Sequence, residues 1–128
     1  MANSVITTIL RDGQRNVVLD TTGVLDTSNY AQTDITNIGI LNPVPNALRI
    51  DHIQYSIQDG LSLQLWWEDT SLTSLILPLA GRGKLDGNWF GGYSNPKRAG
   101  YTGNIMLSTN GWTAGTYYFN LVMELVKQ

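Results

Sequence analysis

The sequence contains no cysteine, which excludes disulfide bonds, thiolate-bound zinc and a cysteine nucleophile. Charge is also scarce: 14% of the residues are charged, against a usual proportion of about a quarter, and the formal net charge is −2. Such a chain has no overall positive field to recruit nucleic acid or an anionic membrane, so we expect neither as a partner. Its length of 128 residues predicts a single domain spanning 1–128.

Long apolar runs are absent as well. No stretch of about 18 consecutive apolar residues occurs, so the sequence predicts no membrane-spanning helix. The first residues, MANSVITTILRDGQ, lack the basic segment and the continuous apolar segment of a secretion signal. We therefore expect a soluble protein that is made in a cytoplasm.

What the chain does contain is alternation of apolar and polar residues with a period of two, the pattern of half-buried strands. In LSLQLWWE (61–68), every second residue from Leu61 to Trp67 is apolar, and TYYFNLVMELV (116–126) alternates in the same way. No segment has convincing helical spacing. Weaker strands are predicted at 4–10, 15–22, 34–40, 48–57, 73–79 and 104–109.

Two local features refine this prediction. The phase of alternation changes within LRIDHIQYSI (48–57), which predicts a β-bulge near Asp51-His52. Asp59-Gly60 lies between two alternating segments and is the strongest hairpin signal in the chain. About eight strands with turn residues between them indicate an all-β fold, and we expect an antiparallel, jelly-roll-like β-sandwich.

Residues suited to catalysis are few. The one histidine, His52, lies next to Asp51 on a predicted strand, where neighbours point to opposite faces, so Asp51 is not expected to orient it. Glu68 and Glu124 both lie on polar strand faces and would have to face each other to act as a glycosidase pair. Solvated carboxylates at strand ends are the simpler interpretation. Gly81-Arg82-Gly83 lacks the helix of a phosphate loop, and no calcium-loop motif occurs. We expect no enzyme, no bound metal and no cofactor.

The segment 81–103 shows neither strand nor helix periodicity and is predicted to be one long, ordered loop, with room for a short strand at 88–91. Its mixture of basic and aromatic side chains is typical of protein interfaces, and also of sites that bind single-stranded nucleic acid. The acidic net charge favours a protein interface. A simpler alternative is that Trp89 and Phe90 close one end of the sandwich. The candidate partner contacts are Arg82, Lys84, Trp89, Phe90, Tyr93, Lys97, Arg98 and Tyr101.

Several segments resemble small virion structural proteins of tailed bacteriophages: VVLDTTGVLD, LRIDHIQYSIQDGLSLQLWWE, LAGRGKLDGNWFGGYSNPKRAGYTGNIMLSTNGW and YYFNLVMELVKQ. The resemblance covers most of the chain and rests on structural motifs. It implies a β-rich subunit present in many copies on the virion, in particular a capsid decoration (cement) protein bound to the major capsid protein. A position in the neck or tail stays open. The resemblance assigns no functional residue.

Two further expectations concern partners. Unpaired edge strands are a hazard for an isolated sandwich, so we expect a homo-oligomer, with a trimer favoured, in which the N-terminal arm 2–10 could pair edges. The alternative function is a carbohydrate-binding β-sandwich, because Trp66 shares a strand face with Gln64 and Glu68 and could stack on a sugar ring.

Overall fold

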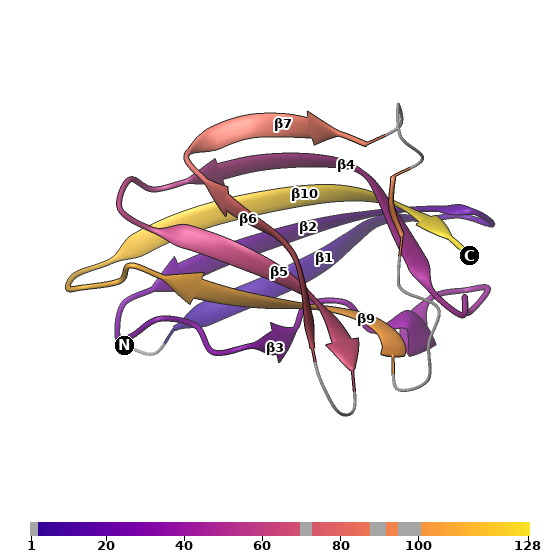
Figure 1. The fold of residues 1–128 in the computed structure, drawn as a ribbon, viewed down its shortest axis with the longest axis horizontal. Helices are drawn as coiled ribbons and strands as arrows, with labels where there is room; N and C mark the ends of the chain where they lie inside the picture. Colours follow the sequence, from indigo (N-terminus) through magenta and orange to yellow (C-terminus); the bar gives the residue numbers. More distant parts are fainter. Residues whose placement is uncertain (1–2, 70–72, 88–91, 95–100) are drawn as a thin grey trace.

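A computed structural model describes residues 3–69, 73–87, 92–94 and 101–128 (Figure 1). Almost every regular element is a strand, and the described ranges contain no helix long and apolar enough to cross a membrane. The elements are β1 (Ser4–Asp12), β2 (Asn16–Leu25), β3 (Thr33–Asp34), the 3-10 helix η1 (Ile38–Ile40), β4 (Leu48–Ile57), β5 (Ser62–Asp69), β6 (Ser74–Ala80), β7 (Arg82–Asp86), β8 (Tyr93–Ser94), β9 (Tyr101–Asn110) and β10 (Tyr117–Lys127).

The strands form two antiparallel sheets that face each other. One sheet has the order β1-β2-β10-β4-β7, with β8 also paired to β4, and the other has the order β3-β9-β5-β6 (Figure 1). With β1 and β8 set aside, the remaining strands pair from the outside inward: β2 with β10, β3 with β9, β4 with β7 and β5 with β6. This is the pairing of a rolled hairpin, the jelly roll. The predicted fold class is confirmed.

The inner faces of the two sheets pack into one hydrophobic core. The fully buried side chains include Leu63 and Leu65 on β5, and Leu121 and Met123 on β10. Trp67 is also buried, so the alternation predicted for both segments is confirmed. Each inward residue is flanked by polar or half-buried residues on the outer face, which is why these segments form strands covered on one side.

Gly23 on β2 makes room for an aromatic ring in this core. It lies directly opposite Phe119 on β10. A Cβ atom built on Gly23 would fall 2.1 Å from two ring carbons of Phe119, a separation that no real contact reaches. The ring of Phe119 therefore occupies the space that any other residue at position 23 would need.

Three local predictions have clear outcomes: one strand and one hairpin are wrong, and the β-bulge is confirmed. The segment 34–40 is not a strand: β3 ends at Asp34 and η1 follows, because the side chain of Asn37 accepts the N–H of Gly39 and caps the helix. Asp59-Gly60 forms a turn but no hairpin, since β4 and β5 belong to different sheets. The bulge is confirmed, because the register shift opposite Glu124 and Leu125 leaves Asp51 without a partner residue.

The prediction that 81–103 lacks secondary structure is also wrong. It contains β7, β8 and the beginning of β9. β7 pairs with β4, yet its sequence RGKLD has no clear alternation because only Leu85 packs against the core. The short strand predicted at 88–91 lies outside the described residues.

Candidate functional site

The predicted contact residues do not form one patch. Arg82 and Lys84 are exposed on the outer face of β7, opposite Ser56 and Gln54 of β4. Tyr93 on β8 instead lies opposite buried Ile50 and packs against the core. Trp89, Phe90, Lys97 and Arg98 lie outside the described residues, as does the side chain of Tyr101, so their role in partner contact stays a prediction.

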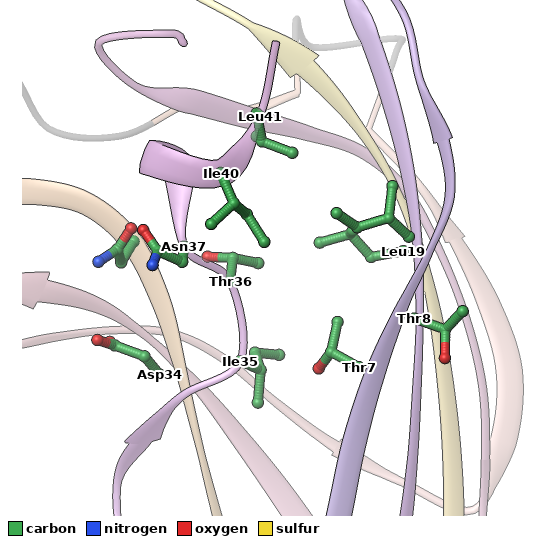
Figure 2. A pocket seen from close by; sticks show the side chains of 11 residues that line it. Thr7, Thr8, Leu19, Asp34, Ile35, Thr36, Asn37, Ile40 and Leu41 are labelled. Atoms are coloured by element: carbon green, nitrogen blue, oxygen red, sulfur yellow. The ribbon is translucent and has the colours of Figure 1, made fainter.

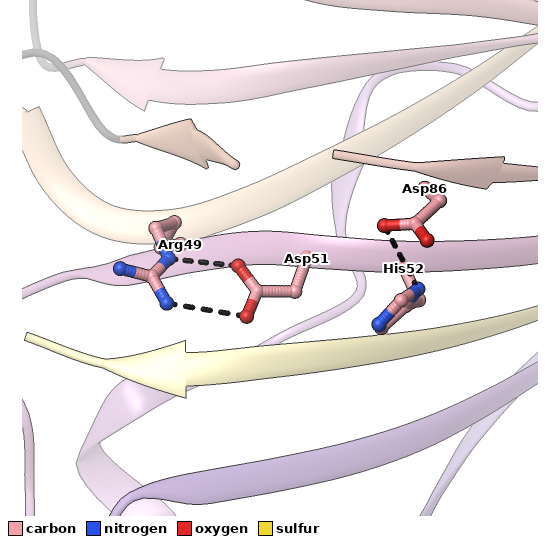
Figure 3. A network of polar contacts seen from close by, with 4 residues as sticks. All are labelled: Arg49, Asp51, His52 and Asp86. Carbon is pink, nitrogen blue, oxygen red and sulfur yellow. Dashed lines mark hydrogen bonds and ion pairs between the residues drawn. The ribbon is translucent and has the colours of Figure 1, made fainter. Parts of the chain in front are cut away.

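Arg49 and Asp51 form a two-point ion pair on β4 (Figure 3). The Arg49 Nε–Asp51 Oδ1 distance is 2.7 Å, and this hydrogen bond raises the pKa of Arg49. The backbone oxygen of Asp51 accepts the N–H of Gly87, and Gly92 donates to the oxygen of Gly87. A Cβ atom on Gly92, whose φ is 84°, would lie 2.6 Å from Asp51 Oδ1. The chain on both sides of 88–91 is thus anchored at this pair.

The bulge puts Asp51 and His52 on the same outer face of β4, not on opposite faces as the sequence predicted, and His52 has a different carboxylate beside it. Its Nδ1 lies 3.5 Å from Oδ1 of Asp86 on β7 (Figure 3), and the two side chains are 37% and 62% exposed. Ion pairs this exposed contribute little to stability. The expectation that Asp51 does not orient His52 is confirmed, because Asp51 binds Arg49.

The candidate glutamate pair does not form. Glu124 lies on β10 and Glu68 on β5, on the outer faces of opposite sheets. Glu68 instead hydrogen bonds Asp34 of β3. Sequence reasoning missed this pairing because it depends on how β3 and β5 flank β9.

We call Asp34, Glu68, Thr102 and Asn104 the carboxyl clasp. Thr102 donates from Oγ1 to Glu68 Oε1 at 2.7 Å, and Asn104 Nδ2 lies 3.5 Å from the same oxygen. Asn104 also accepts the N–H of Ile38 at the start of η1, at 3.0 Å. Partial withdrawal from water, followed by the hydrogen bond to Glu68, raises the pKa of Asp34 to about 6, whereas the hydrogen bond with Asp34 lowers the pKa of Glu68. The clasp holds β3 and η1 against β5 and β9.

A cleft of about 720 Å³ opens between the edges of the two sheets (Figure 2). In the figure, Thr7 and Leu19 from β1 and β2 face Ile35 and Ile40 across the opening, whereas Asp34 points to the far side of its strand. The remaining lining residues are Thr8, Ile9, Thr36, Asn37, Leu41 and Asn104. Ile40 is 63% exposed and Ile9 is 38% exposed, so apolar surface continues out of the cleft.

β1 forms one border of this cleft, and its outer edge pairs with no other strand of the described chain. From Ser4 to Leu10 it carries no charge, and Ile6 and Leu10 are 62% and 57% exposed. An uncharged apolar edge with unpaired backbone groups is a surface to which another strand can add. We refer to β1 and the adjoining cleft as the β1 edge.

Both ends of β1 are held in place. At its start, Asn3 Oδ1 accepts the N–H groups of Asp26 and Thr27. At its end, Asp12 lies 2.7 Å from the ammonium group of buried Lys127 and accepts the N–H of Asn42, and these two contacts lower the pKa of Asp12. Contacts within the chain therefore fix the position of β1 at both of its ends.

Comparison with known proteins adds little. No family model matches the chain, and no curated protein matches it. Among solved structures, a cupin domain from Bordetella pertussis Tohama I is similar, with 12% identity, a TM-score of 0.38, and coverage of 100% of this chain and 98% of the cupin domain. This similarity is too low to carry an argument about function. Within the described ranges, no group of three or more His, Asp or Glu side chains is placed to hold a metal ion.

Proposed function

We propose that this protein is a structural component of a bacteriophage virion, bound in many copies as a capsid decoration (cement) protein. The observation that carries the proposal is that the larger sheet ends in two unlike edges. From Ser4 to Leu10, β1 is uncharged and exposes the apolar residues Ile6 and Leu10. In contrast, β7 carries the exposed basic residues Arg82 and Lys84, and neither outer edge is covered by another described strand. A domain whose sheet has two chemically different edges can bind two different neighbouring proteins. The resemblance of the sequence to phage virion proteins supports the same function.

The two edges suit different partners. Charged rims steer and orient a partner of opposite charge, so we assign the β7 edge to the major capsid protein. The apolar β1 edge is left for contacts between subunits of the same kind. The low charge of the chain suits a subunit surrounded by its own copies, because weakly charged surfaces repel one another little.

Stabilisation would follow from mass action. A protein that binds only the assembled lattice deepens the stability of that lattice by RT ln(1 + [L]/Kd), about 2.7 kcal/mol when the free protein is at 100 times its Kd. Many copies on a symmetric shell multiply the effect, because each contact raises the effective concentration of the next. No chemical step is needed for this function.

The decisive experiment is mass spectrometry of purified particles, followed by thermal melting. We expect peptides of this chain in the particles, and a lower melting temperature for particles assembled without it that recovers when purified protein is added. Arg82→Glu should weaken binding to such particles at least tenfold. Arg15→Glu, which reverses another exposed charge in the β1–β2 turn, is the matched control. Absence from the particles, or equal melting temperatures, would overturn the proposal.

Carbohydrate binding is the second candidate, and the contacts of Trp66 favour it. The indole Nε1 donates to Ser108 Oγ at 2.9 Å, so the ring leans over β9 on the outer face of the smaller sheet. Ser108 in turn donates to Gln64 at 3.2 Å. A partly exposed ring beside an amide and a hydroxyl can stack on a neutral sugar. Retardation by β-glucan or galactomannan in native gels that disappears in Trp66→Ala would support this function. Unchanged mobility would exclude it for these sugars.

A further inference from the structure

The β1 edge has features that indicate what covers it. β1 is 9 residues long, and its outer backbone N–H and C=O groups have no strand beside them within the described chain. Protected edges usually carry charges, proline or bulges along their length. Here the charges Arg11 and Asp12 and the bulge after Ile9 all lie at one end. The rest of the edge is open to another strand.

The uncharged part of β1 is self-complementary when it runs antiparallel to itself. With Thr7 opposite Thr7 of a second copy, Val5 faces Ile9 on the inner side and Ile6 faces Thr8 on the outer side. Directly opposed residues in antiparallel strands point to the same face, so this register keeps apolar residues together. Arg11 and Asp12 of each copy fall beyond the paired segment. No charge is buried and no like charges meet.

We propose that two copies of this chain join edge to edge through β1, running antiparallel about a twofold axis at Thr7. The larger sheets of the two copies then form one continuous sheet. A twofold contact of this kind closes on itself and leaves no free β1 edge, so it removes the risk of open-ended association.

The cleft supports a second copy as the occupant. Thr7 points into the cleft, so Val5 and Ile9, which share its face of β1, lie on the same side (Figure 2). In the proposed register the Val5 and Ile9 side chains of the second copy extend this apolar row past the mouth of the cleft. They would cover Ile40 and Ile9, which are 63% and 38% exposed in the single chain. The same contact therefore pairs the outer backbone N–H and C=O groups of β1 and buries the apolar surface next to them.

This inference differs from the trimer expected from the sequence, because antiparallel pairing of identical strands is twofold. It does not depend on the proposed virion function, since it concerns the purified chain alone. Light scattering during gel filtration should give a dimer of twice 14.1 kDa. Ile6→Lys places two ammonium groups near each other across the axis and should give a monomer. Thr22→Lys adds the same charge opposite Ile6, one strand away from the edge, and should leave the dimer intact.

Cysteine crosslinking tests the register itself, because the chain has no cysteine of its own. Thr7→Cys should form a disulfide-linked dimer under mild oxidation, since opposed Cβ atoms in antiparallel strands lie about 4.5–5.5 Å apart. Ser4→Cys is the control: two copies of position 4 would lie six positions apart, about 20 Å at 3.3 Å per residue, and should not crosslink. Circular dichroism confirms that each variant is folded. A monomer or trimer for the unmodified chain, or equally fast crosslinking of both cysteine variants, would overturn the twofold pairing.

Discussion

Asp34 and Glu68 hydrogen bond to each other although their strands are not neighbours. β9 runs between β3 and β5, and the two carboxyl groups meet above Asn104 and Thr102 of that middle strand. The contact needs one proton between the two groups. Because only three residues separate β3 from η1, we expect the protonation of this pair to change how firmly this wall of the cleft is held.

The first prediction concerns pH. The pKa of Asp34 is raised from 3.8 to about 6, so its contribution to stability is complete below pH 3.8 and is lost as the pH rises through about 6. The pKa of Glu68 is lowered from 4.5, so its contribution is present above pH 4.5 and is lost in acid. Stability from the clasp is therefore greatest between about pH 3.8 and 4.5 and declines as the pH rises from about 4.5 to 6. Since Asp34 is exposed and screened by solvent, we expect a loss of about 0.5–1 kcal/mol from pH 5 to 7 in urea unfolding.

Asp34→Asn isolates this effect, because an amide can hydrogen bond to Glu68 at every pH. The loss of stability between pH 5 and 7 should shrink or vanish in this variant. Asp59→Asn, in the exposed turn between β4 and β5, is the matched control and should retain the loss. An unchanged pH dependence in Asp34→Asn would show that another group is responsible.

The second prediction concerns Thr36, which joins β3 and η1 to the core. Its Oγ1 accepts the N–H of Ile105 at 2.7 Å, and Thr36 is only 4% exposed. Thr36→Val keeps the shape but leaves that N–H without an acceptor, which should cost about 1–3 kcal/mol in chemical denaturation. Thr36→Ser keeps the oxygen and removes one methyl group, so it should cost about 0.8 kcal/mol. The hypothesis fails if the valine variant is as stable as the serine variant.

The third prediction concerns Gly23 and Phe119. Gly23→Ala should destabilise the protein by about 1–3 kcal/mol, because the new methyl group would overlap a ring that is buried in the core. In a Phe119→Leu background the ring is gone and the same substitution should cost less. A double-mutant cycle measures this difference. Purely additive effects of the two substitutions would contradict the steric explanation.

The fourth prediction compares two aspartates on adjacent strands. Asp51→Asn weakens the partly buried ion pair with Arg49 and should cost about 1.5–3 kcal/mol, with faster hydrogen exchange at the amides of Gly87 and Gly92. Asp86→Asn alters the exposed contact with His52 and should cost less than about 1 kcal/mol. Equal effects in thermal and chemical unfolding would argue against a special role for Asp51 in holding Gly87 and Gly92 in place.

Local patterns predicted part of this structure well. The bounds of β4 and its bulge at Asp51 follow from the change of phase in 48–57, because burial on one face dictates which residues alternate. The inward residues of β5 and β10 follow for the same reason. β7 escaped prediction because an edge strand with a single core contact, Leu85, needs no alternation.

The parts that sequence could not predict depend on contacts between distant segments. η1 replaced the expected strand because Asn37 binds the backbone locally and Asn104 receives its first N–H from another strand. Asp34 and Glu68 meet only once β3 and β5 have both joined β9. No pattern within either segment carries that information.

The central place of β10 has a consequence for how the protein forms in the cell. β10 lies between β2 and β4 and pairs with both. The edge of β2 that faces β4 therefore has no paired strand until β10 is present, as the pairing of Leu25 with Tyr117 illustrates. Since β10 leaves the ribosome after all the other described strands, the larger sheet cannot be completed before β10 has been synthesised. Topologies dominated by such distant pairings fold slowly. Until β10 is in place, β2 and β4 lack the strand that lies between them, so incomplete chains are more prone to associate wrongly than the folded protein.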